Sequence, residues 1–262
     1  MCIRDSPSPV RVRVLGAHGG SSPFHRQTSF LVNGSLCVDA GSLTDALPLD
    51  EQSLVRAVLV THAHMDHVAS LPFLVENTFG RRAAPLEIAA PEEVLDALRK
   101  HLFNDALWPD FSSLPNHQVP AVAFRAIPLG EPFEIAGLEG TAIPVSHIVP
   151  TCGYILSGGG ACVVFSGDTG PTEALWKAVR ARGDVKGLFV ECSFPSDLQG
   201  LADSSKHLTP ATLRTEMEKF PKGPPVYLYH MKPPTLARLR AEIAALSDRR
   251  VTVLADGDEL TF

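Results

Sequence analysis

The fold is decided by an apolar run, Ala57-Val-Leu-Val-Thr61, that leads directly into three histidines and an aspartate, His62-Ala-His64-Met-Asp66-His67. The β-branched residues of the run predict a buried strand. Residues 71–75, which follow the histidines, are apolar again. The polar group between two apolar segments therefore belongs at an edge of the core and is not a plain solvated loop.

The spacing of these polar residues suits metal binding. Alternate residues at a strand end point the same way, so His62 and His64 can hold one metal ion. Asp66 and His67 then turn toward a second position, and carboxylate with neutral imidazole suits Zn²⁺, Mn²⁺ or Fe²⁺. One tight loop cannot complete two such sites, so further ligands must come from distant segments.

Three later residues are candidates for these ligands. His147, Asp168 and His230 each come directly after a segment that predicts a strand. Taken singly, a histidine or aspartate in such a position is more often a capping or structural residue. Taken together after the first motif, they indicate a metal centre at the rim where the strands end.

This ordered set resembles the metallo-β-lactamase superfamily, and the resemblance covers nearly the whole chain, from about Val10 to Phe262. It implies an α+β four-layer αβ/βα sandwich, in which two mixed sheets are flanked by outer helices. It also implies two divalent metal ions between the sheets, with Zn²⁺ expected and Mn²⁺ or Fe²⁺ as alternatives. In the family pattern one ion is held by His62, His64 and His147, the other by Asp66, His67 and His230, and Asp168 bridges them.

The remaining patterns agree with two sheets and outer helices. We expect one hydrolase domain over residues 10–262 after a disordered leader, residues 1–9. Many strands are joined by hairpins, as at Asn33-Gly34, which fits a doubly wound parallel sheet poorly. Helices are expected at 92–101, 172–182, 209–220 and 235–246. Strands are expected at 10–15, 29–32, 36–39, 57–61, 86–89, 122–126, 133–135, 140–145, 153–156, 161–165, 187–191, 226–230, 251–254 and 259–262.

Composition excludes several classes of protein. The 262 residues are 45% hydrophobic and 20% charged, which is globular and neither fibrous nor wholly disordered. No apolar run is long enough for a membrane-spanning helix, so no membrane partner is expected. The net charge of -6 disfavours a nucleic-acid partner, because phosphate backbones attract basic proteins. Five scattered cysteines indicate reduced thiols and a cytoplasmic location, with a periplasmic or secreted one left open if a signal precedes the chain.

Further segments narrow the reaction. In chain order, the segments 15–23, 104–111, 191–195, 207–210 and 229–233 are similar to class II 3′,5′-cyclic-nucleotide phosphodiesterases. The resemblance implies hydrolysis of cAMP or cGMP to 5′-nucleoside monophosphates by a hydroxide held between two metals. The sequence departs from these relatives at Met65 and Ala69-Ser70, which concerns the packing of the loop and not the metal ligands.

Three residues are candidates for proton transfer. Asp66 can orient the attacking water or accept its proton while it ligates a metal. Glu191 and His207 resemble the Glu–His pair of phosphodiesterases that include the tRNA 3′-end-processing ribonucleases. His207 would protonate the leaving 3′-alkoxide, and Glu191 would orient His207. A helix-capping role for His207 and a plain strand-end charge for Glu191 are the alternatives.

Three others are candidates for substrate contacts. Asn104 and Trp108 lie in an aromatic-rich segment that could cover a nucleobase, although Trp108 could equally pack that segment onto the core. By analogy with the family, His18 lies near the metal rim, where it and the Gly19-Gly20 loop could contact phosphate. A simple turn explains the two glycines equally well.

Other functions of the same fold stay open as alternatives, because a fold does not fix a reaction. They are a lactonase, thioesterase or β-lactamase, and an RNA-processing phosphodiesterase. The last would need a basic RNA-gripping arm, and no Lys/Arg-rich insertion exists. A binding module without activity is disfavoured, because every ligand position is filled. The expected partner is a small-molecule nucleotide substrate, and a homodimer is compatible with the family.

Overall fold

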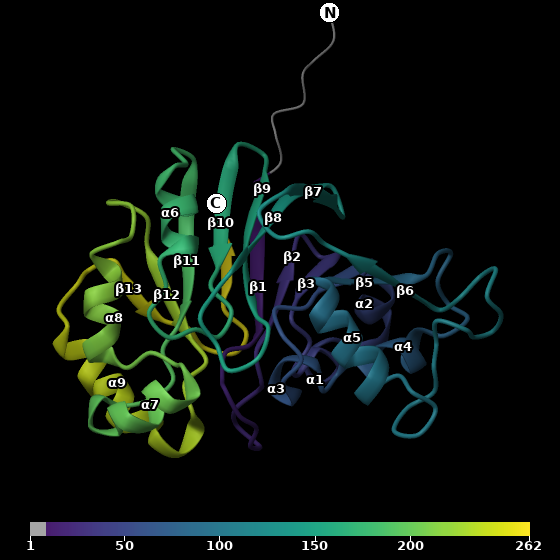
Figure 1. Ribbon diagram of the computed structural model, residues 1–262, viewed down its shortest axis with the longest axis horizontal. Coiled ribbons are helices and arrows are strands. Elements are labelled where there is room, and N and C mark those ends of the chain that lie inside the picture. Colours follow the sequence, from purple (N-terminus) through teal and green to yellow (C-terminus); the bar gives the residue numbers. More distant parts are fainter. Residues whose placement is uncertain (1–8) are drawn as a thin grey trace, which may run out of the picture.

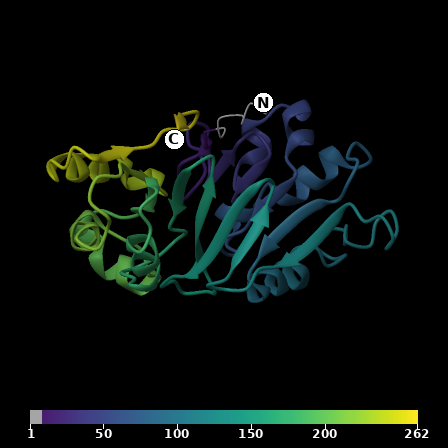
Figure 2. The ribbon, with the colours of Figure 1, turned by 90° about the horizontal axis from the view of Figure 1, so that it is seen from above.

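The computed structural model describes residues 9–262, in which two seven-stranded sheets pack face to face (Figure 1). Except for Pro9, the leader expected at residues 1–9 lies outside the described residues. The expected α+β four-layer sandwich is confirmed, because each sheet carries helices on its outer side (Figure 2).

The first sheet has the strand order β14-β1-β2-β3-β4-β5-β6. Its strands are antiparallel from β14 to β3 and parallel from β3 to β6, so the C-terminal strand β14 closes the edge beside β1. The strands are β1 (Arg11–Gly16), β2 (Ser29–Val32), β3 (Leu36–Val38), β4 (Ala57–Leu59), β5 (Leu86–Ala90), β6 (Val122–Ala126) and β14 (Glu259–Thr261).

The second sheet has the order β13-β12-β11-β10-β9-β8-β7. It is antiparallel from β7 to β10 and parallel from β10 to β13. The strands are β7 (Pro132–Ile135), β8 (Leu138–Pro144), β9 (Cys152–Gly158), β10 (Ala161–Phe165), β11 (Val185–Glu191), β12 (Val226–Tyr229) and β13 (Val251–Val253).

The helices divide between the two outer faces, with α1 to α5 on the first sheet and α6, α8 and α9 on the second. They are α1 (Leu43–Ala46), α2 (Leu49–Leu54), α3 (Met65–Val68), α4 (Leu71–Thr78), α5 (Glu92–His101), α6 (Ala174–Arg180), α7 (Gln199–Ser205), α8 (Pro210–Met217) and α9 (Leu236–Ala245). Two short 3₁₀ helices, η1 (Ser196–Leu198) and η2 (Pro233–Thr235), precede α7 and α9.

The main core lies between the sheets and explains the alternation seen in the sequence. Val10, Val12 and Val14 all point into it, while the arginines between them do not. At its centre the Phe30 ring meets the rings of Phe165, Phe189 and Tyr229 at centroid distances of 5.1, 5.5 and 5.1 Å. Tilted and edge-on aromatic contacts of this kind are favourable. They hold the two sheets together, and with them the loops at the sheet edges.

Most predicted elements are confirmed, and the differences have local causes. The helix at 92–101 and the strand at 122–126 have the bounds that were expected. The other three expected helices begin later and end earlier than predicted, as at Thr209, which caps α8 from outside with its side chain. Five helices, α1 to α4 and α7, were not expected, and α3 begins inside the histidine motif itself.

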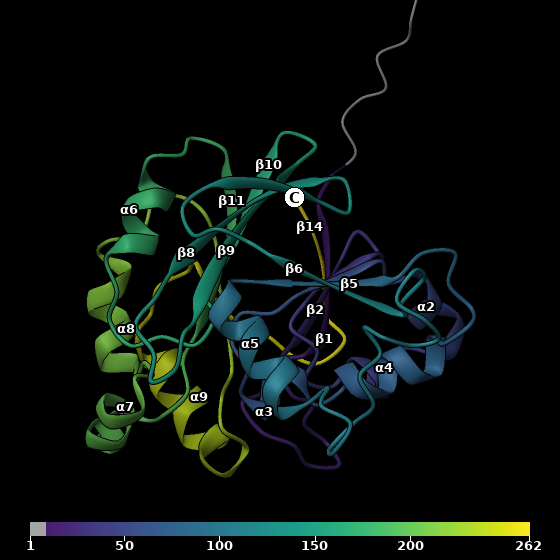
Figure 3. The ribbon, with the colours of Figure 1, turned by 45° about the vertical axis from the view of Figure 1, so that its right-hand side comes forward.

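Two further expectations concern the described part of the chain. None of the helices in residues 9–262 combines the length and apolar character needed to cross a membrane. The four cysteines there, Cys37, Cys152, Cys162 and Cys192, are free and buried. The helix α3 lies at the lower edge of the molecule in Figures 1 and 3, and this edge carries the cluster described next.

Candidate metal centre

The first sheet contributes the histidine motif, which begins where β4 ends. The Asp39 carboxylate accepts hydrogen bonds from the Thr61 backbone N–H at 2.8 Å and from the Thr61 hydroxyl at 2.9 Å. His64, whose own backbone is extended, is the N-cap residue of α3. Because alternate residues of an extended segment share a side, the His62 Nε2 and His64 Nδ1 atoms lie 3.0 Å apart.

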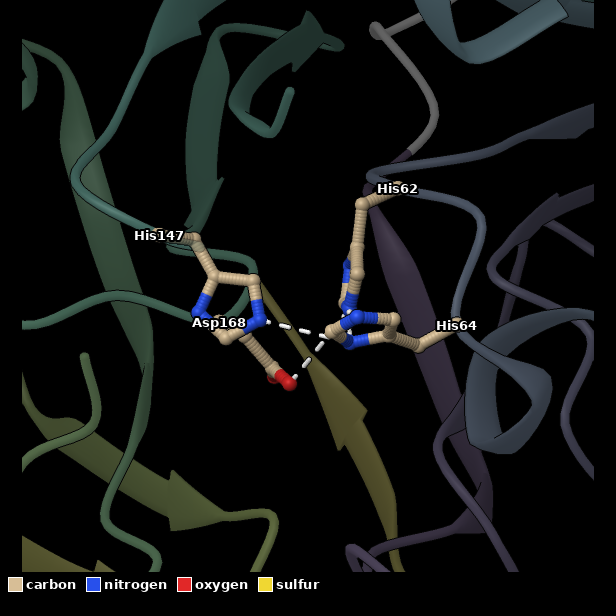
Figure 4. A group of neighbouring side chains, drawn as sticks. All are labelled: His62, His64, His147 and Asp168. Carbon is tan, nitrogen blue, oxygen red and sulfur yellow. Dashed lines mark hydrogen bonds and ion pairs between the residues drawn. The ribbon is translucent and has the colours of Figure 1, made fainter. Parts of the chain in front are cut away.

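The second sheet contributes residues that face this motif (Figure 4). His147 comes from the loop after β8, and its Nε2 lies 3.3 Å from His64 Nδ1. Asp168 follows β10, and its Oδ2 lies 3.6 Å from His62 Nε2. One ligand atom from each of these four residues falls within 4.8 Å of the others. The structure therefore brings together the four residues predicted for the first site and the bridge.

A second group lies beside the first. Asp66, His67 and His230 also place ligand atoms within 4.8 Å of one another. The His230 Nε2 atom is 3.1 Å from His67 Nε2 and 3.2 Å from Asp66 Oδ2. Asp168 Oδ2 lies 3.3 Å from His67 and 3.2 Å from His230, so the same oxygen borders both groups. This is the position that a bridging carboxylate would need.

The donor set fits divalent metal ions on two observations. Asp168 Oδ1 is a buried carboxylate oxygen without a hydrogen-bond partner, which is costly unless another ligand satisfies it. Five histidine rings also converge in these groups, together with the carboxylates of Asp66 and Asp168. Imidazole and carboxylate are ligands that Zn²⁺, Mn²⁺ and Fe²⁺ all accept. The cluster can therefore hold metal, and its donors suit several of these ions.

Burial and neighbouring charge set the protonation of the cluster. Burial, aided by the charge of His67, holds the pKa of His62 well below its usual range, and burial brings the pKa of His230 to about 4. Burial opposes the ionised form of Asp168, but His230 and His67 hold its pKa well below the ordinary value. Neutral imidazole and ionised carboxylate are the forms that ligate metals, so the surroundings favour ligation at these three residues.

Three residues that sequence reasoning did not assign orient the cluster. Asp39 Oδ2 lies 2.7 Å from His67 Nδ1, and the Ser193 hydroxyl lies 2.9 Å from His230 Nδ1. The Lys206 carbonyl lies 3.2 Å from His147 Nδ1 and can only accept a hydrogen bond, so Nδ1 carries the proton and Nε2 is free to ligate. Such contacts fix the orientation and the tautomer of a histidine ring that ligates a metal. Of these three residues, only Asp39 could have been recognised from the sequence, because it is a carboxylate at the end of an apolar run.

The backbone at His230 is held in an uncommon conformation. Its φ is 67°, in the left-handed region that non-glycine residues rarely adopt. The His230 N–H donates to the Ala17 carbonyl at 2.7 Å, and a Cβ on Gly19 would stand only 2.7 Å from the His230 ring and carbonyl. Only a glycine allows this approach. Strain of this kind persists where the surroundings enforce it, often at functional sites.

The predicted Glu191–His207 pair is formed beside the cluster. Both side chains are buried, and Glu191 Oε1 lies 2.7 Å from His207 Nδ1. The carboxylate also accepts from the Thr169 N–H at 3.0 Å and from the Ser193 hydroxyl at 2.9 Å. Burial opposes protonation of His207, but Glu191 raises its pKa above the usual value. The capping alternative for His207 is not supported, because the ring is buried and stacks on His230.

His207 has a second capability that the sequence did not suggest. With Asp168 and His230 it forms another group whose ligand atoms lie within 4.8 Å of one another. Its ring centroid is 5.0 Å from that of His147. The geometry therefore allows His207 to serve either as a proton donor at the cluster or as a metal ligand, and an experiment must separate the two roles.

The residues predicted to contact substrate lie outside these groups. Asn104 is exposed and bonds to the Lys100 carbonyl at 2.9 Å, and Trp108 meets Phe73 at a ring distance of 5.2 Å while packing on the outer core. His18 is buried, with its Nδ1 3.2 Å from Asp256 Oδ1. Within residues 9–262 no hydrogen bond joins these three side chains to the cluster, so their roles stay predictions.

Comparisons with known proteins agree with this geometry. A family model described as the beta-lactamase superfamily domain matches residues 29–243. A probable 3′,5′-cyclic-nucleotide phosphodiesterase of Yersinia pestis is 26% identical, and the match covers 87% of this chain and 80% of that protein. A ribonuclease Z of Mycobacterium bovis is 30% identical over 46% of each chain. Among solved structures, yeast PDE1 superposes with a TM-score of 0.81 at 18% identity, covering 97% of this chain and all of that one, which shows a shared fold.

Proposed function

The chain belongs to the metallo-β-lactamase superfamily, and on that premise we propose that this hydrolase is a dinuclear-metal phosphodiesterase acting on 3′,5′-cyclic nucleotides. The products would be 5′-nucleoside monophosphates. The proposal is supported by the Yersinia relative, whose name is probable 3′,5′-cyclic-nucleotide phosphodiesterase and which matches most of both chains. The substrate itself is our inference from the site.

The observation that carries the proposal is the Glu191–His207 pair next to Asp168 and His230. Opening a cyclic phosphodiester expels a sugar 3′-alkoxide, which is a poor leaving group and needs a proton. A histidine held by a buried carboxylate and placed against the cluster can supply that proton. Hydrolysis of an ester with a good leaving group makes less demand for such a donor.

The other residues have assigned roles in this proposal. His62, His64 and His147 would hold one ion, Asp66, His67 and His230 would hold the other, and Asp168 borders both groups of ligands. When bound, two divalent ions would offset the phosphate charge and supply activated water. We assign to Asp66, whose side chain is a fifth exposed, the role of orienting the attacking water or accepting its proton. Zn²⁺ is the expected metal, and the chemistry of the ligands admits Mn²⁺ or Fe²⁺.

Three residues would contact the substrate in this proposal. Trp108 would offer an indole face to a nucleobase, which is worth about 1–3 kcal/mol when a base stacks on it. Asn104 and His18 would contribute polar contacts. The partner is a small-molecule nucleotide, the location is cytoplasmic, and neither a nucleic acid nor a membrane is required.

A substrate panel tests the function. Purified protein supplied with Zn²⁺ or Mn²⁺ would be assayed on 3′,5′-cAMP, 3′,5′-cGMP, bis-p-nitrophenyl phosphate, a thioester and a β-lactam. We expect turnover of the cyclic nucleotides and of the diester, with the largest kcat/KM on a cyclic nucleotide. Turnover of the thioester or the β-lactam alone would contradict the proposal.

A second candidate function is an RNA-processing phosphodiesterase. It is favoured by the ribonuclease Z match, although that match covers under half of each chain. The net charge of -6 opposes it, since RNA binding gains affinity from basic surfaces. Adding a precursor tRNA to the panel separates the two, because specific cleavage of its 3′ end with no cyclic-nucleotide turnover would favour the RNA function.

A further inference from the structure

Lys232 lies in the turn after β12, two residues beyond His230, and its backbone is fixed from both sides. Its N–H lies 3.3 Å from the Ser193 carbonyl. Its own carbonyl accepts from the Thr235 N–H at 3.1 Å and from the Thr235 hydroxyl at 3.2 Å. The side chain therefore leaves from a backbone that is tied both to the cluster and to the 3₁₀ helix η2.

The side chain is directed toward the cluster. Lys232 Nζ lies 3.3 Å from Asp66 Oδ2, the oxygen that also lies 3.2 Å from His230 Nε2. In the described part of the chain, Lys232 is the only lysine or arginine that forms an ion pair with a cluster carboxylate. One-quarter of its side chain and one-fifth of the Asp66 side chain remain exposed, whereas Asp168 and the other cluster residues of this turn are buried. The ammonium group thus stands at the open side of the cluster.

A structural ion pair explains this arrangement poorly. Partly exposed pairs contribute little to stability, with a typical value of about 0–1 kcal/mol. Asp66 already has His230 as a partner and does not need a second one. An ammonium group carries three donors, and only one is directed at Asp66, so two remain for a ligand that enters from solvent.

We propose that Lys232 is a specificity-determining residue that binds a non-bridging oxygen of an anionic phosphodiester. The inference rests on the proposed function and deepens it, since it explains how this site would prefer an anionic ester over a neutral one. A phosphodiester carries a negative charge that a carboxylic ester or thioester lacks. Lysine binds phosphate as a point charge, so it rewards that charge without requiring one fixed geometry.

The first measurement is binding, which does not depend on turnover. The affinity of the metal-loaded protein for inorganic phosphate would be measured by calorimetry for wild type, Lys232→Met and Lys232→Arg. We expect Lys232→Met to weaken phosphate binding on the order of 10-fold and Lys232→Arg to weaken it much less, because the charge is kept. Lys186→Met, at an exposed position near the start of β11, is the matched control and should bind phosphate like the wild type.

The second measurement compares an anionic and a neutral ester with the same leaving group. Lys232→Met should lower kcat/KM for bis-p-nitrophenyl phosphate by about 10–100-fold and lower that for p-nitrophenyl acetate clearly less. Metal content should stay at the wild-type value. Equal losses on both esters, loss of metal, unchanged phosphate affinity, or no phosphate binding to the wild type would each overturn the inference.

The two proposals can fail separately. If the wild type turns over no cyclic nucleotide but Lys232→Met still weakens phosphate binding, the phosphate subsite stands and the proposed substrate is wrong. If the wild type hydrolyses cyclic nucleotides and Lys232→Met leaves phosphate affinity and the diester-to-acetate preference unchanged, the function stands and Lys232 only supports Asp66.

Discussion

Asp168 borders both groups of candidate ligands through one oxygen, and its other oxygen is buried without a protein partner. An asparagine of the same shape would remove the charge that faces His67 and His230. We therefore predict that Asp168→Asn lowers hydrolysis by about 10²-fold or more, the scale of a residue that supports metal-assisted attack. Elemental analysis should also find less metal per chain.

The control for this variant is Asp96→Asn, which changes an exposed carboxylate on α5 that pairs with Arg99. It should keep both metal content and turnover. Two metals per chain together with wild-type hydrolysis in Asp168→Asn would show that Asp168 does not bridge.

A substitution of His207 gives the most direct test of the phosphodiesterase proposal. A general acid contributes about 10²–10⁴-fold when the leaving group is poor and little when it is good. We therefore predict that His207→Ala damages hydrolysis of a 3′,5′-cyclic nucleotide far more than hydrolysis of bis-p-nitrophenyl phosphate, whose leaving group needs no proton. Metal content, measured on the same preparation, should be unchanged.

Each other outcome for His207→Ala has a definite meaning. Metal loss would make His207 a ligand, as its contacts with Asp168 and His230 allow. Equal loss on both substrates with metals in place would point to phosphate binding. His101→Ala, at the exposed end of α5, is the control and should change neither rate.

At the scale of elements, the β1–β2 loop lies very close to the turn after β12, and this contact leads to a prediction. A Cβ at Gly19 would lie 2.7 Å from both the ring and the carbonyl of His230. Gly19→Ala must push one segment away, and such overpacking costs about 1–3 kcal/mol. We expect a lower Tm and weaker metal binding, measured by thermal unfolding and elemental analysis.

Gly183→Ala is a suitable comparison for this element, because no atom lies within 4 Å of the added Cβ and the backbone has no positive φ. It should leave Tm and metal content near the wild-type values. If the two alanine variants behaved alike, the contact between Gly19 and His230 would have no structural role.

The elements also show which parts of the fold were predictable from the sequence. The strand at 122–126 and the helix at 92–101 could be placed because a short, mostly apolar run and the proline before the helix are local signals. The four-residue helices α1 and α3 could not, since they are shorter than two turns and show no period. The conformation of α3 also depends on contacts with residues distant in the sequence, and a local sequence pattern does not describe such contacts.

The candidate site divides in the same way. His147, Asp168 and His230 were predictable because strand ends share an edge, whatever joins the strands. Their supporting contacts were not predictable, since Asp39 reaches His67 across 28 positions and Ser193 reaches His230 across 37. Lys206 reaches His147 across 59 positions. Each pair joins loops of a single sheet, so it depends on the order of the strands in that sheet and on the path of the loops, which the sequence pattern does not encode.

For the whole molecule, the cluster has a structural consequence because its residues come from both sheets. His62, His64, Asp66 and His67 follow β4 of the first sheet, whereas His147, Asp168 and His230 follow strands of the second. Ions bound among them would join the sheets at one edge, while the aromatic core joins them at the centre. Metal should therefore stabilise the folded chain as well as support hydrolysis.

We predict that a chelator lowers the Tm of the protein and that Zn²⁺ or Mn²⁺ restores it. A ligand present at 1,000 times its Kd stabilises the folded state by about 4 kcal/mol. For a chain of this size that corresponds to a shift of roughly 10 °C. The measurement is thermal unfolding with and without chelator, and Asp168→Asn should respond much less because it has lost the carboxylate that borders both groups. Equal Tm values for the wild type in chelator and in metal would mean that the two sheets are held by the apolar core alone, and that any bound ion serves catalysis only.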